Sequence, residues 1–349
     1  MKRYSIFKIS VALFTMVLFF TSCYKEEITI GSAASDYFYV ERNGASMMTL
    51  VRGNTESKKF LLIIHGGPGD SGISYYNPDM NKYIESRYAV AYYDQRDAGA
   101  SQGNDNMKDI SLENMVEDVR GLIKVLKKRY GQDIDIYMMG HSFGGLLSSA
   151  FMTTDNYQEM VKGWIYVDGA HDYTKNDSLT RLMLISEGEK QIALGKNIEE
   201  WGEIMQYCNE HPGNFSVEES MKYNSLAWKA QSLIEEIHKP ESLGFPPLNS
   251  PTMMVPVTAK LSALVANGDF IKDIVHAGYC DVLYKVKLPV LIIYGKYDFV
   301  CPKGLGEELI SLISSKDKQM VISEVSSHVP MNEDPEFFYS QVIGFIENH

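Results

Sequence analysis

Cysteines, basic residues and long apolar runs are scarce in this sequence, and each shortage argues against a class of protein. Four cysteines occur in 349 residues without the Cys-x-x-Cys spacing of a zinc site, and it stays open whether Cys208 and Cys280 pair. The 33 basic residues form no basic stripe and are outnumbered by 45 acidic ones. Because contacts to phosphates need clustered Lys and Arg, we expect no nucleic-acid partner. With 27 glycines, 12 prolines and 45% hydrophobic residues, the chain is neither collagen nor disordered.

The longest apolar run, residues 9–20, follows three basic residues near the N-terminus. As a helix it would span about 18 Å, which is too short for a hydrocarbon core of about 30 Å. The run therefore predicts a signal peptide rather than a transmembrane helix. Residues 1–22 hold three positive charges and no acidic residue, so their removal changes the net charge from −12 to −15.

The end of this run, Phe20-Thr21-Ser22-Cys23, resembles a bacterial lipoprotein box in which phenylalanine replaces the usual leucine. The resemblance implies a signal peptide over 1–22, lipidation of Cys23 and a tether over 23–35. The next residues, Tyr24-Lys25-Glu26-Glu27, resemble the signal that exports lipoproteins of the Bacteroidota to the cell surface. We therefore expect an outer-membrane lipoprotein of a bacterial cell envelope, exposed at the surface and held to the membrane by its lipid. Plain secretion with an incidental cysteine is the alternative.

Strand-like and helical segments alternate from residue 36 onward. Asn43-Gly44 predicts a tight hairpin turn, and apolar residues recur at helical spacing over 112–126 between the Ser111 cap and the Gly131 stop. Short apolar runs of the kind buried on both faces of a parallel sheet lie at 60–64, 88–93, 134–139, 164–167, 289–294 and 320–325. The alternation predicts a doubly wound, mostly parallel α/β sheet with right-handed crossovers.

The segment 170–285 breaks this alternation, because it has no strand-like run. Helices are predicted instead at 177–194, 199–209, 217–239 and 257–266. An insertion of roughly 115 residues is too long for a connection inside a compact domain. We therefore predict a helical lid over 170–285 on a core formed by 36–169 and 286–349.

A Gly-x-Ser-x-Gly motif, Gly140-His141-Ser142-Phe143-Gly144, lies between the strand-like run 134–139 and an apolar helix over 146–152. A strand that turns at once into a helix strains the central residue and presents its side chain at the carboxyl edge of the sheet. Ser142 is therefore the predicted nucleophile. The adjacent His141 points the wrong way along the backbone to act as its base.

A serine hydroxyl needs a base, and the base needs a carboxylate that fixes its tautomer. In this arrangement the chain order is Ser, acid, His. Asp298 follows the run 289–294 and His328 follows the last run, so both are predicted at the same sheet edge as Ser142. Asp168, which follows the run 164–167, is the alternative acid.

Backbone N–H groups usually stabilise the oxyanion of a tetrahedral intermediate. The predicted donors are Phe143, at the helix start, and Gly67, in the loop His65-Gly66-Gly67-Pro68-Gly69. The same loop contains Gly67-x-Gly69-x-x-Gly72, a match to the dinucleotide fingerprint, with Asp94 as a candidate ribose-binding acid. The proline within the match and the turn-forming residues 75–78 weigh against that interpretation. Without a Walker loop or a His-Glu-x-x-His pair, we predict neither a cofactor nor a metal.

Several motifs together resemble the α/β-hydrolase superfamily and, within it, the proline iminopeptidase group. They are residues 65–69, 94–101, 140–145, 295–302 and His328. The resemblance implies an α/β-hydrolase fold with an inserted lid and a serine hydrolase. His141, Phe143 and Asp97 depart from the group, which has glycine, tryptophan and glycine there. The group binds the substrate's free amine with lid carboxylates, and the candidates are Glu187, Glu189, Glu218 and Glu219.

The sequence thus predicts a cofactor-free serine hydrolase that forms an acyl-enzyme with a small-molecule or short-peptide substrate. An aminopeptidase of proline iminopeptidase type is the first expectation, and a carboxylic ester hydrolase is the alternative. Two other classes stay open, namely a surface lipoprotein that binds a ligand without catalysis and a nicotinamide oxidoreductase.

Overall fold

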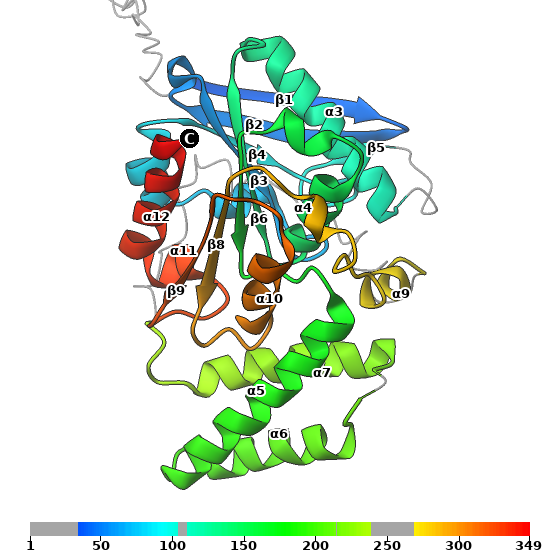
Figure 1. Ribbon diagram of the computed structural model, residues 1–349, viewed down its shortest axis with the longest axis vertical. Coiled ribbons are helices and arrows are strands. Elements are labelled where there is room, and N and C mark those ends of the chain that lie inside the picture. Colours follow the sequence, from blue (N-terminus) through cyan, green and yellow to red (C-terminus); the bar gives the residue numbers. More distant parts are fainter. Residues whose placement is uncertain (1–33, 104–109, 214, 239–268) are drawn as a thin grey trace, which may run out of the picture. The chain divides into compact units, whose positions relative to one another are not determined.

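A nine-stranded sheet organises the residues that the computed structural model describes, which are 34–103, 110–213, 215–238 and 269–349 (Figure 1). Its order is β1-β2-β4-β3-β6-β7-β8-β9, with β5 paired to β2 beside this path. The strands are β1 (Ala34–Arg42), β2 (Ala45–Gly53), β3 (Lys59–Ile64), β4 (Ala89–Tyr93), β5 (Gln102–Gly103), β6 (Asp135–His141), β7 (Gly163–Val167), β8 (Val290–Gly295) and β9 (Lys318–Ser323). From β4 through β9 all neighbours on the path are parallel, so the doubly wound α/β prediction is confirmed.

The antiparallel edge comes from the predicted hairpin. β1 and β2 pair in register from Arg42 opposite Ala45, and the turn between them has positive φ at Asn43 and Gly44, 46° and 79°. Asparagine and glycine tolerate that conformation better than other residues. Ala34 and Ser35, which were predicted to belong to the tether, already lie in β1.

Helices cover both faces of the sheet because side chains alternate along each strand. Leu62 and Ile64 of β3 pack in one apolar cluster with α3 and α4, whereas Leu61 and Ile63 pack in a second cluster with α12. The helices beside the sheet are α2 (Pro78–Met80), α3 (Leu112–Tyr130), α4 (Phe143–Thr153), α10 (Gly304–Leu312), α11 (Pro330–Glu333) and α12 (Pro335–Asn348), with shorter turns η1 (Thr55–Ser57), η2 (Gly72–Tyr75), η3 (Asn81–Glu85), η5 (Tyr157–Met160) and η7 (Leu283–Lys285). The α3 helix begins at the predicted Ser111 cap, whose hydroxyl accepts from the Asn114 amide, and ends at Gly131 with φ of 120°.

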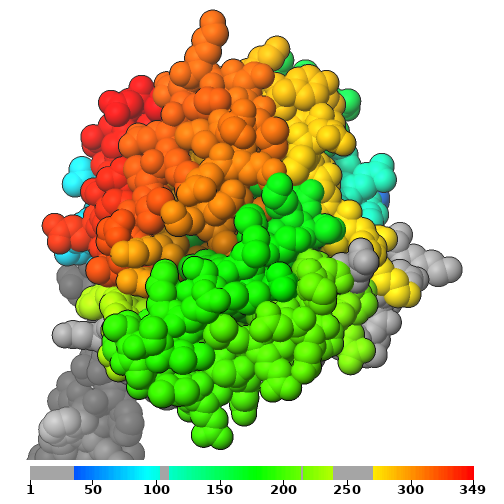
Figure 2. Space-filling model, turned by 60° about the horizontal axis from the view of Figure 1, so that its bottom comes forward, coloured from blue at the N-terminus to red at the C-terminus, as the bar shows by residue number. Residues whose placement is uncertain are grey.

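Between β7 and β8 the described residues form helices rather than strands, and the first three correspond to the helices predicted at 177–194, 199–209 and 217–239. The helices are α5 (Tyr173–Ala193), α6 (Ile198–Glu210), α7 (Val217–Leu233) and α9 (Asp269–Val275). In Figure 1, α5, α6 and α7 lie beyond the carboxyl ends of β8 and β9. Figure 2 shows the surface of these helices, in green, against the orange segment that includes α10. The two parts are closely packed, because a Cβ added to Gly304 of α10 would lie 3.2 Å from the Leu179 side chain of α5. Residues 33–349 form one compact unit.

Some predictions concern residues outside the described ranges. They are the signal peptide over 1–22, lipidation at Cys23, most of the tether and the helix over 257–266. Among the helices that the structure describes, none combines the length and apolar character needed to cross a membrane.

Candidate active site

Ser142 occupies a sharp turn between β6 and α4. Its backbone has φ of 55° and ψ of −122°, in the positive-φ region that a residue with a side chain seldom adopts. The turn is possible because the residues two positions before and after Ser142 are glycines. A Cβ on Gly140 would lie 2.3 Å from the Ser148 hydroxyl, and one on Gly144 would lie 2.0 Å from the Ile64 carbonyl oxygen. The backbone strain predicted from the motif is therefore present at Ser142.

His328 connects Ser142 to Asp298 through two hydrogen bonds. The imidazole Nε2 lies 2.9 Å from the Ser142 Oγ, and Nδ1 lies 2.9 Å from the Asp298 Oδ2. Since a carboxylate accepts, Nδ1 carries the proton and Nε2 is left to accept from the serine hydroxyl. The three side chains, which are up to 186 residues apart in the sequence, therefore form one continuous path.

Backbone amides hold the Asp298 carboxylate in place. Its Oδ1 accepts from the amides of Val300 and Cys301 at 2.8 and 2.9 Å, and its side chain is fully buried. These bonds leave Oδ2 directed at His328. The loop after β8 thus orients the acid before any substrate binds.

The alternative acid, Asp168, lies next to this path but does not take the imidazole proton. Its Oδ1 accepts from the Gly295 amide at 2.8 Å, whereas its buried Oδ2 has no hydrogen-bond partner among the described residues. Burial, followed by the nearby charge of Asp298, raises the pKa of the Asp168 carboxyl well above its ordinary value.

The loop after β3 borders the nucleophile, as the oxyanion prediction requires. A Cβ on Gly66 would lie 3.1 Å from the Cβ of Ser142, so the Gly66 backbone is packed against the nucleophile. Gly67 follows with φ of 109°. Phe143 is the first residue of α4, and its amide therefore has no carbonyl four residues earlier within the helix. The roles of Gly67 and Phe143 as oxyanion donors stay predictions.

His141 has a structural role that the sequence did not reveal. Its Nε2 lies 2.7 Å from the His328 carbonyl oxygen, to which it donates, and its Nδ1 accepts from the Tyr75 hydroxyl. The same hydroxyl accepts from the Gly66 amide at 3.1 Å. Burial lowers the pKa of His141 to about 3, so the ring is neutral and keeps this tautomer. A chain of bonds thus joins the loop after β3 to the backbone of His328.

Asp94 fastens the same loop and is not available to a ribose. Its Oδ1 accepts from the Ser71 hydroxyl at 2.8 Å and the Gly72 amide at 2.7 Å, while its Oδ2 accepts from the Ala100 amide at 2.7 Å. Gly72 begins a turn of only four residues, η2, rather than the helix that a dinucleotide pyrophosphate requires. The geometry therefore disfavours the nicotinamide interpretation of the glycines.

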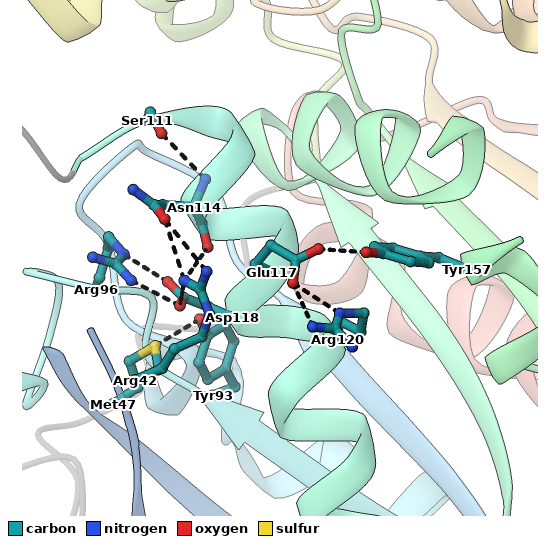
Figure 3. Close-up of polar contacts among 10 residues, drawn as sticks. All are labelled: Arg42, Met47, Tyr93, Arg96, Ser111, Asn114, Glu117, Asp118, Arg120 and Tyr157. Atoms are coloured by element: carbon teal, nitrogen blue, oxygen red, sulfur yellow. Dashed lines mark hydrogen bonds and ion pairs between the residues drawn. The ribbon is translucent and has the colours of Figure 1, made fainter. Parts of the chain in front are cut away.

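Gln95 and Arg96 extend this support from the loop to α3. The Gln95 side chain donates to the His65 carbonyl at 2.9 Å. The buried Arg96 guanidinium makes a two-point ion pair with Asp118 at 2.6 and 2.8 Å, and Arg42 reaches the same carboxylate at 2.9 Å (Figure 3). The Asp-Gln-Arg motif is therefore a structural clamp behind the catalytic loop.

The glutamates proposed to bind a substrate amine occupy helix surfaces and caps. Glu187 pairs with Lys190 on its own helix, and Glu219 completes the capping box of α7 with Ser216. Glu189 and Glu218 are exposed. These surroundings are typical of solvated or capping positions.

Other lid residues lie near the Ser142–His328 pair. The Trp228 ring of α7 stands edge-on to the His328 ring at 5.4 Å, and the Phe270 ring of α9 lies 6.3 Å from that of Phe143. Asp177 of α5 is only 4% exposed. Its charge, after burial and the charges of Asp298 and Asp168, helps to raise the pKa of the Cys301 thiol. Sequence periodicity could not show that Asp177 is buried, because it is one polar residue among many on α5.

The three cysteines in the described part of the chain, Cys208, Cys280 and Cys301, are free thiols. Cys208 and Cys280 therefore do not pair in this structure. Cys301 is buried beside the Ser142 hydroxyl.

Comparisons with known proteins agree with this geometry. Residues 55–193 match the family described as serine aminopeptidase, S33. A proline iminopeptidase of Saccharolobus solfataricus is 26% identical over 296 residues, which cover 83% of this chain and 86% of that protein. Among solved structures, the proline iminopeptidase of Mycobacterium smegmatis aligns over 90% of this chain and 98% of its own, with 16% identity and a TM-score of 0.60. An esterase of Exiguobacterium antarcticum aligns over 89% and 99%, with 15% identity and a TM-score of 0.55.

The chain is therefore an α/β-hydrolase in fold, which indicates a hydrolase. Over most of its length it resembles the proline iminopeptidases, as its motifs predicted. The solved structures share the fold with both peptidases and esterases, so they do not distinguish between these two activities.

Proposed function

We propose that this protein is a serine hydrolase that acts through an acyl-enzyme and releases the N-terminal residue of short peptides. The observation that carries the proposal is the continuous path from the Ser142 hydroxyl through His328 to Asp298, with 2.9 Å at each step. This is the geometry of nucleophile, base and orienting acid.

Each group has a defined step in the reaction. Ser142 Oγ attacks the substrate carbonyl as His328 Nε2 takes the hydroxyl proton, and Asp298 stabilises the resulting imidazolium. The amides of Gly67 and Phe143 donate to the oxyanion of the tetrahedral intermediate. His328 then gives its proton to the leaving amine, the C–N bond breaks, and the acyl group stays on Ser142. Water then attacks this ester as His328 takes its proton, the bond between the acyl carbon and Ser142 Oγ breaks, and His328 returns the proton to Ser142 as the free acid leaves.

A peptide with a free N-terminus brings an ammonium group into the site, and Asp177 is the lid carboxylate that we propose to bind it. Two observations support this choice. Asp177 is buried rather than solvated, and its charge acts on the Cys301 thiol beside Ser142. Trp228 provides an apolar wall next to His328 that suits a proline ring or another compact side chain.

Covalent labelling tests the nucleophile. A fluorophosphonate probe is expected to label the protein stoichiometrically, and Ser142→Ala is expected to abolish the label while the far-UV circular dichroism stays unchanged. Binding of a ligand without catalysis is the correct description if the unmodified protein takes no label at all.

A substrate panel then separates the two activities. Aminoacyl anilides, with proline included, are compared with short p-nitrophenyl esters, and each anilide is also tested after N-acylation. The proposal expects turnover of the proline anilide that disappears when its amine is acylated. Rapid ester hydrolysis with no turnover of any anilide would identify a carboxylic ester hydrolase instead.

A further inference from the structure

A second cluster of reactive side chains lies where the lid joins the core. His171 and Asp172 follow β7, just before α5 begins, and Cys280 lies where the chain returns toward β8. The two passages are bridged, because Asp172 pairs antiparallel with Gly278 and the Tyr279 amide donates to the His171 carbonyl at 3.0 Å. The cluster therefore gathers residues from both ends of the lid.

Glu308, on the core helix α10, completes the group. One ligand atom from each of His171, Cys280 and Glu308 lies within 4.8 Å of the other two. The His171 Nε2 is 3.2 Å from the Glu308 Oε2, and the Cys280 Sγ is 3.8 Å from the same oxygen. Asp172 is the next donor, with its Oδ2 3.6 Å from the Cys280 Sγ.

These separations suit a tetrahedral metal ion. Zinc binds imidazole nitrogen at about 2.0 Å, thiolate sulfur at about 2.3 Å and carboxylate oxygen at about 2.1 Å, which places neighbouring ligand atoms about 3.3–3.6 Å apart. The distance of 3.2 Å from His171 Nε2 to Glu308 Oε2 is close to this range. So are the distances of 3.8 and 3.6 Å from Cys280 Sγ to Glu308 Oε2 and to Asp172 Oδ2. Only small side-chain movements are needed to direct all three donors at one ion.

We propose that His171, Cys280 and Glu308 bind a zinc ion, with Asp172 as the neighbouring carboxylate. The donor set selects the metal, because a thiolate excludes magnesium and calcium, and a mixed nitrogen, sulfur and oxygen set is typical of zinc. The thiol gives its proton to solvent when the metal binds. The site does not include Ser142, His328 or Asp298, so this inference is independent of the proposed hydrolase activity.

Burial and charge support an ordered site with an entry path. The His171 side chain is fully buried, whereas that of Glu308 is 23% exposed and Cys280 is half-buried. Lys175 pairs with the other Glu308 oxygen, Oε1, at 2.8 Å and offsets part of the negative charge. The imidazole is therefore fixed within the protein while the carboxylate and thiol face the approach from solvent.

A zinc ion here would fasten both ends of the lid to α10. The chain between His171 and Cys280 holds the four lid helices that the structure describes, so its two ends are drawn to one point of the core. Metal binding is thus expected to raise the thermal transition of the protein, since a ligand that binds only the folded state stabilises it.

Metal titration tests the site directly. Protein freed of metal with a chelator is titrated with Zn²⁺ by calorimetry and with Co²⁺ by optical absorption. One equivalent is expected to bind, and cobalt is expected to show a thiolate charge-transfer band. Cys280→Ser and Glu308→Gln are each expected to weaken zinc binding at least about tenfold, and Cys280→Ser also removes the band. Glu307→Gln is the matched control, because this neighbour on α10 pairs with Lys303 instead.

A measurement on the unsubstituted protein avoids any folding defect of the variants. Zinc is expected to protect Cys280 from alkylation, whereas magnesium at the same concentration leaves its rate unchanged. Unprotected Cys280, zinc binding without a cobalt–thiolate band, or equal affinity in the two variants and the control would each overturn the proposal.

Discussion

Two buried carboxyl groups, Asp298 and Asp168, belong to this site, and their surroundings explain which one serves as the acid. Asp298 receives two backbone amides and the imidazole, all of which stabilise its ionised form. Asp168 is fully buried with one backbone donor, Gly295, and it faces the charge of Asp298. Asp298 is therefore the carboxylate that accepts from His328, whereas burial and the nearby charge of Asp298 raise the pKa of the Asp168 carboxyl.

This assignment predicts an unequal effect of two similar substitutions. Asp298→Asn should lower kcat/KM by roughly 10³- to 10⁴-fold, because an amide cannot hold the imidazole in the same tautomer or stabilise its positive charge. Asp168→Asn should lower it less than about tenfold, since the imidazole Nδ1 is bonded to Asp298 and not to Asp168. Steady-state kinetics on a turned-over anilide or ester measures both. The reverse ranking would reassign the acid to Asp168.

Asp177 gives the site a pH dependence of its own. Burial raises its pKa to about 6, so it is ionised at neutral pH and becomes neutral below that value. If it binds the substrate amine, KM for a proline anilide should rise as the pH falls through 6, because the neutral acid no longer attracts the ammonium group.

The variant Asp177→Asn isolates this effect from the titration of the catalytic groups, which both proteins share. Its KM for the anilide should exceed that of the unsubstituted protein by about tenfold or more above pH 7, and the two values should converge near pH 5. An ester without an amine is the control and should show no such difference. A constant ratio across the pH range would remove Asp177 from amine binding.

At the level of the elements, β4 and α3 support a loop that belongs to β3. Asp94 and Gln95, just after β4, bond to the loop on either side of Gly67, and Arg96 transmits the support to Asp118 of α3. The Arg96–Asp118 ion pair in this clamp is buried and therefore desolvated. Loss of either partner would leave the charge of the other without full compensation.

Removing one partner should therefore be costly. Arg96→Ala is expected to lower the free energy of unfolding by about 3 kcal/mol, because Asp118 stays buried with only Arg42 beside it. Urea denaturation followed by circular dichroism measures the loss. Arg96→Met combined with Asp118→Leu should recover much of it, since no unpaired charge is then buried. A loss below about 1 kcal/mol for Arg96→Ala would show that the pair is not structural.

The elements that sequence predicted well are those set by local pattern. The strand β6, the Ser142 turn and α4 follow from an apolar run, two glycines and a second apolar run, so their order is readable without coordinates. The boundaries of β9 were less accurate, because its pairing with β8 ends at Ser323 although the apolar run continues to Val325.

Features that depend on contacts across the fold were not readable. The choice of Asp298 over Asp168 depends on which carboxyl reaches the imidazole from a neighbouring strand. The link from His141 to Tyr75 joins residues 66 positions apart. His171, Cys280 and Glu308 come from three separate segments, so their spacing in the sequence resembles no metal motif.

At the scale of the whole molecule, the described lid and core form one compact unit, while the N-terminal residues are predicted to have a separate task. β1 begins at Ala34, so the interval from Cys23 to the first strand is short. We propose that a lipid on Cys23 anchors the hydrolase to the bacterial outer membrane and that the protein is exposed at the cell surface.

This proposal predicts a change of partitioning from one substitution. The full-length protein made in a bacterium should enter the detergent phase of a Triton X-114 extraction and take up an alkyne fatty acid, because lipid chains gain about 0.8 kcal/mol for each buried CH₂. Cys23→Ser should move it to the aqueous phase without label, whereas Cys208→Ser should keep both properties, since Cys208 is buried in the lid. Protease treatment of intact cells then tests exposure, and an unlabelled, aqueous full-length protein would indicate plain secretion.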